Sequence, residues 1–195
     1  MLILTGLTAP IRASAAEVAT PEAAVTAFMD SVREWDAAAA SAFLGDAVPG
    51  NYADILCNLV LAPTLEKLDY TLGNSRITGR SAVVDISVTA ADLKGCAGDL
   101  LAEAAGCAAL AKLTGLPIDV EQYVTGRMET YMHPDNLTTI RTDTSVYLLL
   151  GGDGAWSIDV TDLRNLRFLE ALTGGMVALE EPIRALSSEI AGNVK

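Results

Sequence analysis

The sequence has little positive charge, and this shortage excludes two classes of partner. Lys and Arg number 13 against 25 Asp and Glu, so the formal net charge is -12 at pH 7. Binding to nucleic acid or to an anionic membrane surface depends on clustered positive charge, so neither partner is expected here. Apolar runs are also short. None reaches the roughly 18 residues that a membrane-spanning helix needs, so no integral membrane span is expected.

The sequence also lacks the motifs that would identify a catalytic or metal centre. His133 is the only histidine, and the three cysteines form no C-x-x-C pair, so a zinc site is not expected. No G-x-S-x-G nucleophile elbow is present. The glycine-rich segment 151–154 lacks a lysine and is typical of a hairpin loop rather than of a phosphate site. We therefore assign no catalytic residue, no metal ligand and no cofactor from the sequence.

The first 16 residues are similar to the end of a secretory signal peptide. An apolar stretch is followed by small residues at Ala13 and Ala15, the two positions that a signal peptidase reads. We expect cleavage beside Ala15 and Ala16 and export to the extracellular space or the cell envelope. No Lys or Arg precedes the apolar stretch, so the pattern is incomplete. The alternative is an apolar N-terminal strand or a disordered arm.

The remaining chain is long and apolar enough for one packed domain. The whole sequence has 195 residues, of which 51% are hydrophobic. This length fits one domain better than two, and this composition supplies a sizeable core. We expect residues 17–195 to form a single domain.

Three cysteines could supply one disulfide in an oxidising compartment. Of Cys57, Cys96 and Cys107, the last two are nearest in sequence. Within one continuous helix they would lie about 16 Å apart, because each residue advances a helix by about 1.5 Å, and this is too far for a disulfide. They could pair only if the chain turned between them, at Gly98 or Gly106. The alternative is that all three are small buried apolar residues.

Hydrophobic periodicity predicts an α+β order of helices, two strands, helices, two strands and helices. Apolar and polar residues alternate, as in strands, at 68–72, 82–90, 140–150 and 156–160. Helical spacing and capping residues predict a helix from Pro21 and further helices at 37–44, 51–61, 98–113, 118–132, 163–172 and 176–195. This order favours a curved antiparallel sheet packed against helices, with the last segment as an added C-terminal helix.

Three parts of the chain fit a known family pattern. The opening TPEAAVTAFMDSVREWDAAAASAFL fits two helices, YTLGNSRITGRSAVVDISVTAADL fits a strand pair, and TDTSVYLLLGGDGAWSID with NLRFLEALTGGM fits a final hairpin and short helix. On these segments the chain resembles small exported bacterial domains of the nuclear transport factor 2-like superfamily. The resemblance covers residues 21–175. The long segment 95–132 and the helix after Gly175 are additions to the family pattern.

The resemblance implies a cone-shaped, cystatin-like domain with a cavity, a fold that hosts isomerases, dehydratases, cyclases and many non-catalytic binding modules. Catalysis in such a cavity needs a buried Asp or His base and a Tyr or Asp donor. The side chains of these types are Tyr70, Tyr123, Tyr131, Asp85 and Asp159. Asp85 and Asp159 are expected on the solvated sides of their strands. The aromatic residues that could line the cavity, or belong to the core instead, are Phe28, Trp35 and Trp156.

The leading hypothesis is an exported binding or interaction module without catalytic activity. Its partner would be an unknown protein, a cell-envelope component, a second copy in a homodimer, or a small apolar ligand. The apolar helix at 100–113 and the amphipathic helix at 179–190 offer surfaces for such contacts. The alternative is a small-molecule isomerase, dehydratase or cyclase acting in the cavity, which a cavity carboxylate beside a hydrogen-bonding Tyr would favour.

Overall fold

The computed structural model describes residues 20–44, 62–115, 120–131 and 133–175. Several predictions lie outside these residues: the signal segment 1–16 with Ala15 and Ala16, Cys57, the helix 51–61 and the end helix 176–195. Within the described ranges, no helix combines the length and the apolar character needed to cross a membrane.

The fold is α+β and is built on a four-stranded antiparallel sheet, as predicted. The strands lie in the order β1 (Asp69–Thr78), β2 (Ser81–Ala91), β3 (Thr139–Leu150) and β4 (Trp156–Ile158). β2 pairs with β3 along its whole length, so the two predicted strand pairs form one sheet. β4 ends two residues before the predicted end at 160, because Asp159 and Asn165 take over the pairing with Tyr147.

Helices precede the sheet, interrupt it and follow it. They are α1 (Pro21–Arg33), α2 (Ala37–Ser41), α4 (Ala62–Leu65), α5 (Leu93–Thr114), α6 (Val120–Tyr131) and α7 (Leu166–Leu172), with a short 3₁₀ turn, η2 (Leu163–Asn165), before α7. Most of these match the predicted helices to within a few residues. α2 is shorter than the predicted 37–44, and the predicted helix 163–172 is divided between η2 and α7.

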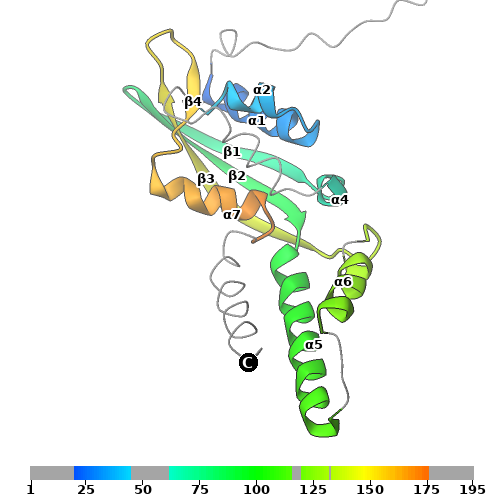
Figure 1. The fold of residues 1–195 in the computed structure, drawn as a ribbon. Helices are drawn as coiled ribbons and strands as arrows, with labels where there is room; N and C mark the ends of the chain where they lie inside the picture. The colour runs from blue at the N-terminus through cyan, green and yellow to red at the C-terminus, as the bar shows by residue number, and fades with distance from the viewer. Residues whose placement is uncertain (1–19, 45–61, 116–119, 132, 176–195) are drawn as a thin grey trace, which may run out of the picture.

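One face of the sheet forms the core, and α1 and α7 both pack on it (Figure 1). Side chains alternate along a strand, so the even-numbered residues of β2 and β3 point to this face, among them the fully buried Val84 and Val146. Phe28 of α1 meets Phe168 of α7 there, with ring centroids 6.0 Å apart. Phe28 and Trp156 therefore both belong to the core.

Local residues explain where α1 begins and ends. Thr20 caps the helix by accepting a hydrogen bond from the Ala23 N–H at 3.2 Å. The helix ends in a Schellman turn, in which the Asp36 N–H donates to the Ser31 carbonyl at 2.8 Å. Trp35 takes the left-handed position of this turn, with φ of 58°, where glycine is usual. Its side chain is 42% exposed.

α5 and α6 form an arm between β2 and β3, and this helical arm extends away from the sheet (Figure 1). α5 begins at Leu93 rather than at the predicted Gly98. The reason is Asp92, whose carboxylate accepts a hydrogen bond from the Gly95 N–H at 2.8 Å and so caps the helix. The glycine at 98 lies inside the helix, because the cap and the following apolar residues outweigh its low helix propensity.

The described chain ends at two glycines that lie against β2 and the start of α5. Gly174 has φ of 58° and passes so close to β2 that a Cβ atom would lie 1.8 Å from the Ala91 carbonyl oxygen. The Gly174 carbonyl accepts a hydrogen bond from the Lys94 N–H at 3.0 Å. Only glycine fits this conformation and this close approach.

Candidate functional site

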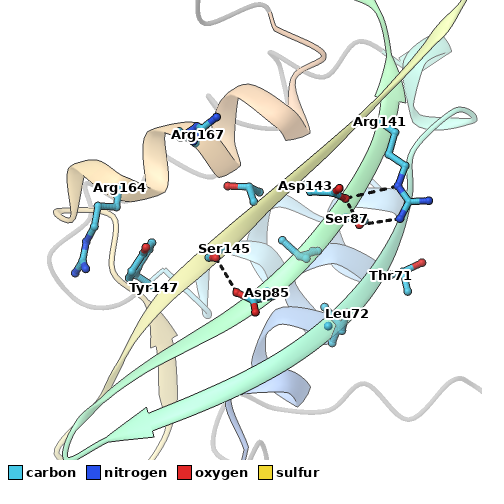
Figure 2. Close-up of a pocket in the computed structure, with 13 residues that line it drawn as sticks. Thr71, Leu72, Asp85, Ser87, Arg141, Asp143, Ser145, Tyr147, Arg164 and Arg167 are labelled. Carbon is cyan, nitrogen blue, oxygen red and sulfur yellow. Dashed lines mark hydrogen bonds and ion pairs between the residues drawn. The ribbon is translucent and has the colours of Figure 1, made fainter.

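The face of the sheet opposite the core is polar and carries a groove. This sheet groove measures about 770 Å³ and crosses β1, β2 and β3 to the edge where η2 and α7 follow β4 (Figure 2). Most of the β2 and β3 residues that line it are at odd-numbered positions, because the even-numbered side chains point to the core face; Ile86 and Thr144 are the even-numbered residues of the lining. The polar and charged residues of the lining are Thr71, Asp85, Ser87, Arg141, Asp143, Thr144, Ser145, Tyr147, Arg164 and Arg167.

One part of the sheet groove holds a serine between an arginine and an aspartate. Ser87 lies opposite Asp143 in the register of β2 and β3, and its hydroxyl donates to the Asp143 carboxylate. Arg141 donates to the Ser87 Oγ at 3.0 Å, and its Nε lies 3.6 Å from the Asp143 carboxylate (Figure 2). The hydrogen bond from Ser87 is the main cause that lowers the pKa of Asp143. Asp143 is therefore ionised at neutral pH and cannot act as a general acid there.

The middle of the sheet groove is occupied by Asp85, which lies on the face predicted for it. Its carboxylate accepts a hydrogen bond from the Ser145 hydroxyl at 2.8 Å, and the Arg76 guanidinium lies 3.4 Å away. Gly73 leaves room for this carboxylate at the irregularity in β1, since a Cβ there would lie 3.1 Å from the Asp85 Cβ. The Asp85 carboxylate is therefore fixed by Ser145 of β3 and Arg76 of β1 rather than simply solvated.

The rim of the groove beyond β3 carries two arginines. Arg164 places its guanidinium over the Tyr147 ring, 3.9 Å from the centroid, and its Nε donates to the Asp162 carboxylate at 2.9 Å. These contacts fix the Arg164 side chain, and its hydrogen bonds lower the pKa of Asp162. Arg167 lies three residues further on, on α7, and within the described part of the chain it has no ion pair or hydrogen bond (Figure 2).

The structure does not gather the five sequence candidates into one cavity. Asp85 lies in the sheet groove, Asp159 in the loop after β4, Tyr70 on β1, and Tyr123 and Tyr131 on the helical arm. The Tyr70 hydroxyl does meet a carboxylate, donating to Asp30 of α1 at 3.0 Å, but this contact is on the exposed surface. No shared site for a base and a donor follows from these positions.

Tyr123 and Tyr131 instead belong to a polar cluster that joins α5 to α6. The Glu103 carboxylate of α5 accepts hydrogen bonds from Arg127 Nε and Nη2 at 2.9 and 3.0 Å, from Tyr131 at 2.9 Å and from Tyr123 at 3.2 Å. These donors, Arg127 first, lower the pKa of Glu103 to about 2. We call this cluster the Glu103 clamp. Its carboxylate has several donors from one partner helix, so the clamp fixes the two helices of the arm to each other.

The remaining sequence candidates are placed apart from the groove. Cys96 and Cys107 are free thiols on α5, and the helix is continuous between them, so the turn that a bridge would need is not present. His133 lies on the exposed surface with its Nδ1 3.6 Å from the Asp135 carboxylate. Among the residues that the structure describes, no group of three or more His, Cys, Asp or Glu side chains is placed to hold a metal ion.

Sequence reasoning missed most of the groove and the clamp. Signals for both exist in the chain. The polar side of β3 reads Arg141, Asp143, Ser145 and Tyr147 at every second position, which is richer in charge than a plain solvated strand needs. Tyr123, Arg127 and Tyr131 recur every four residues, the spacing that places side chains on one helix face.

Comparisons with known proteins add little to this geometry. No protein-family model matches the chain, and no curated protein matches it. Among solved structures, it is similar to a "putative lipoprotein (ycdA)" from Bacillus subtilis, with a TM-score of 0.42 and 12% identity over 74% of this chain and 44% of the other. The chain thus spans less than half of that protein, and a similarity this low supports no inference about function. Membership of the nuclear transport factor 2-like superfamily stays a prediction.

Proposed function

We propose that this chain is a non-catalytic binding module of the extracellular space or cell envelope, and that its ligand lies in the sheet groove. The single observation that carries the proposal is the groove of about 770 Å³ on the polar sheet face, with hydrogen-bonding side chains from three strands and two arginines on its rim. A concave site with a few convergent polar groups is the usual form of a ligand site. The place outside the cytoplasm rests on the signal-like pattern of residues 1–16.

The lining favours a polar ligand that carries one anionic group. Asp85 and Asp143 are already bonded by donors of the protein, so they offer little to a cationic ligand. Arg167 is without a partner in the described part of the chain, and Arg164 is fixed beside it. Planar guanidinium groups suit carboxylate or phosphate oxygens. The small apolar ligand expected from the sequence finds less support in this lining.

The charge of the whole chain limits the ligand further. A net charge of -12 repels polyanions at long range. A ligand with a single anionic group is repelled much less, and within a Debye length of Arg164 and Arg167 the attraction of these two side chains acts on it. The ligand class is therefore a small polar molecule or an extended chain with one carboxylate or phosphate end.

A binding role fits the protonation states better than catalysis does. The pKa values of Asp143, in the groove, and Asp162, beside its rim, are both lowered. These carboxylates are therefore ionised near neutral pH, so they cannot act as general acids there, and they are weak general bases. The three tyrosine candidates from the sequence, Tyr70, Tyr123 and Tyr131, lie on β1 and on the helical arm, outside the groove. Tyr147 does line the groove, but its ring is covered by the Arg164 guanidinium. No observation favours the isomerase, dehydratase or cyclase hypothesis over binding.

The test compares two small molecules that differ only in charge. N-acetylglycine carries one carboxylate, and N-acetylglycinamide is its neutral match; inorganic phosphate serves as a second anion. Each is titrated at constant ionic strength while NMR follows the arginine side chains and the backbone of β3. We expect both anions to shift the signals of Arg167 and Tyr147, and the amide to shift them at least fivefold less.

Two variants make the test specific. Arg167→Gln removes the guanidinium from the rim and should abolish the response. Arg33→Gln removes an exposed arginine at the end of α1, outside the groove, and should leave it unchanged. Equal shifts with the acid and the amide would contradict the anionic group, and no response at the groove to any of the three molecules would overturn the site itself.

A further inference from the structure

The two carboxylates of the sheet groove each use only one oxygen toward the rest of the described chain. Oδ1 of Asp85 accepts the hydrogen bond from the Ser145 hydroxyl at 2.8 Å, and Oδ1 of Asp143 accepts the one from the Ser87 hydroxyl. Among the described residues, the second oxygen of each carboxylate, Oδ2, has no hydrogen-bond or ion-pair partner. The sheet groove therefore presents two open acceptor atoms.

An arginine balances the charge of each of these carboxylates. Arg76 Nη2 lies 3.4 Å from Asp85 Oδ1, and Arg141 Nε lies 3.6 Å from Asp143 Oδ1. A cationic ligand gains less from a carboxylate that already has a cation beside it, because the arginine repels the incoming charge. A neutral donor is not repelled in this way. The open oxygens therefore favour neutral hydrogen-bond donors, such as hydroxyl or amide groups, over ammonium groups.

Open donors lie beside the open acceptors, and this pattern favours hydroxyl groups. Toward the described residues, Arg76 bonds through Nη2 alone and Arg141 through Nε and Nη2. Each guanidinium therefore keeps N–H groups available next to an open carboxylate oxygen. A hydroxyl group can donate to that oxygen and accept from the guanidinium at the same time, whereas an amide N–H can only donate. A hydroxylated ligand therefore satisfies this surface better than a peptide amide does.

The open oxygens lie at regular steps from the arginines on the rim. Asp85 is opposite Ser145, and two residues further along β3 is Tyr147, which the Arg164 guanidinium covers. Two residues of a strand span about 7 Å. Asp143 lies one such step from Ser145 in the other direction (Figure 2). A molecule that spans one step and places an acidic group at the rim therefore brings its other groups to Asp85 first.

On the basis of the proposed function, we propose that the ligand of the sheet groove is a sugar that carries one acidic group. The acidic group binds Arg167 at the rim, and ring hydroxyls donate to Asp85 Oδ2 and accept from Arg76. In a longer saccharide, Asp143 and Arg141 make the same pair of contacts with the next ring. The volume of about 770 Å³ lies within the usual range of small-molecule sites.

Two ring acids of equal charge test the hydroxyl contacts. Methyl β-D-glucuronide carries a carboxylate and ring hydroxyls, and tetrahydropyran-2-carboxylate has the same kind of ring and carboxylate without the hydroxyls. Each is titrated into the full chain at constant ionic strength, while NMR follows the Arg167 side chain and the backbone of β3. We expect the sugar acid to bind roughly tenfold more tightly than the hydroxyl-free acid, the gain that one or two net hydrogen bonds give.

The variant Asp85→Asn makes the test specific. It keeps the oxygen that accepts from Ser145 and replaces the open oxygen with an NH₂ group, which is a donor. The ratio of the two dissociation constants should fall from roughly ten to about two or less. The hydroxyl-free acid should still bind, which shows that the variant is folded. The control Asp69→Asn removes an exposed carboxylate at the start of β1, outside the groove lining, and should leave the ratio unchanged.

Failure of this proposal can be told apart from failure of the proposed function. Equal affinities of the two ring acids, or a ratio that Asp85→Asn does not lower, would overturn the sugar as ligand and leave the anion site at Arg167 in place. If neither ring acid nor N-acetylglycine shifts the signals of Arg167, the sheet groove does not bind anions, and both the proposed function and the sugar are wrong.

Discussion

The Glu103 clamp predicts an unusual titration that can be measured at one carbon atom. Its carboxylate accepts four hydrogen bonds, two of them from the Arg127 guanidinium, and all four favour the ionised form. We expect the side-chain carboxyl of Glu103 to titrate with a midpoint at about pH 2 instead of the ordinary 4.5. The assay is the pH dependence of its carboxyl ¹³C chemical shift in the folded protein.

The low pKa of Glu103 makes the stability of the fold depend on pH, because protonation and folding are thermodynamically linked. The pKa of Glu103 is lower in the folded chain than in the unfolded chain, so the clamp contributes stability that is fully present above pH 4.5. This contribution is lost progressively as the pH falls toward about 2. The packing of α6 on α5 should therefore loosen in this window of pH, while the sheet, which does not depend on the clamp, changes less.

Variants separate the causes and provide the refutation. Arg127 is the largest cause of the low pKa, so Arg127→Gln should move the midpoint most of the way back toward 4.5. Tyr123→Phe removes the longest and weakest of the hydrogen bonds and should move it least. Asp99→Asn, an exposed carboxylate one turn earlier on α5, is the control and should leave the midpoint in place. A midpoint near 4.5 in the unmodified protein, or one that Arg127→Gln does not raise, would refute the role assigned to these bonds.

Three further outcomes follow from the fold and the sequence. Gly174→Ala should lower the free energy of unfolding, measured by chemical denaturation, by roughly 2–4 kcal/mol, because residue 174 has a left-handed conformation and the added Cβ would clash with the Ala91 carbonyl. The control Gly152→Ala, with open space around its Cβ, should change the free energy of unfolding far less. Phe168→Ala should cost roughly 3–5 kcal/mol in the same assay because it empties the contact with Phe28, whereas Leu163→Ala, at a side chain 78% exposed, should change it by less than about 0.5 kcal/mol. Mass spectrometry of the protein recovered from culture medium should find a first residue near Ala16 or Glu17, and a cytosolic protein that retains Met1 would contradict export.

The sheet was the most predictable part of the molecule. Alternation from Ala82 to Ala90 and from Ile140 to Leu150 set both which residues are strands and which side faces the core, because a period of two has no competing interpretation over such lengths. The strand partners could not be read so directly, because pairing β2 with β3 requires the chain to return after the whole helical arm.

The groove and the clamp were much harder to predict, because their contacts join residues that are far apart in the sequence. Ser145 meets Asp85 across 60 positions of sequence, and Arg127 meets Glu103 across 24. Such contacts depend on strand register and on the crossing of two helices, which local spacing does not determine. The start of α5 also differs from the prediction, because the Asp92 cap begins the helix before Gly95 and Gly98.

β4 is short, so it pairs with only part of the outer edge of β3, and the side chain of Asn165 covers the next position of that edge. Beyond Ile158, the Tyr147 carbonyl still accepts a hydrogen bond from the Asp159 N–H, but without Asn165 the Tyr147 N–H would be open to a strand of another molecule, and such open edges promote aggregation. The buried Asn165 amide accepts from the Tyr147 N–H and donates to the Tyr147 carbonyl, both at 2.9 Å, and so imitates one residue of a neighbouring strand. The edge of β3 at Tyr147 is thereby closed to a strand of another molecule by a side chain of the chain itself.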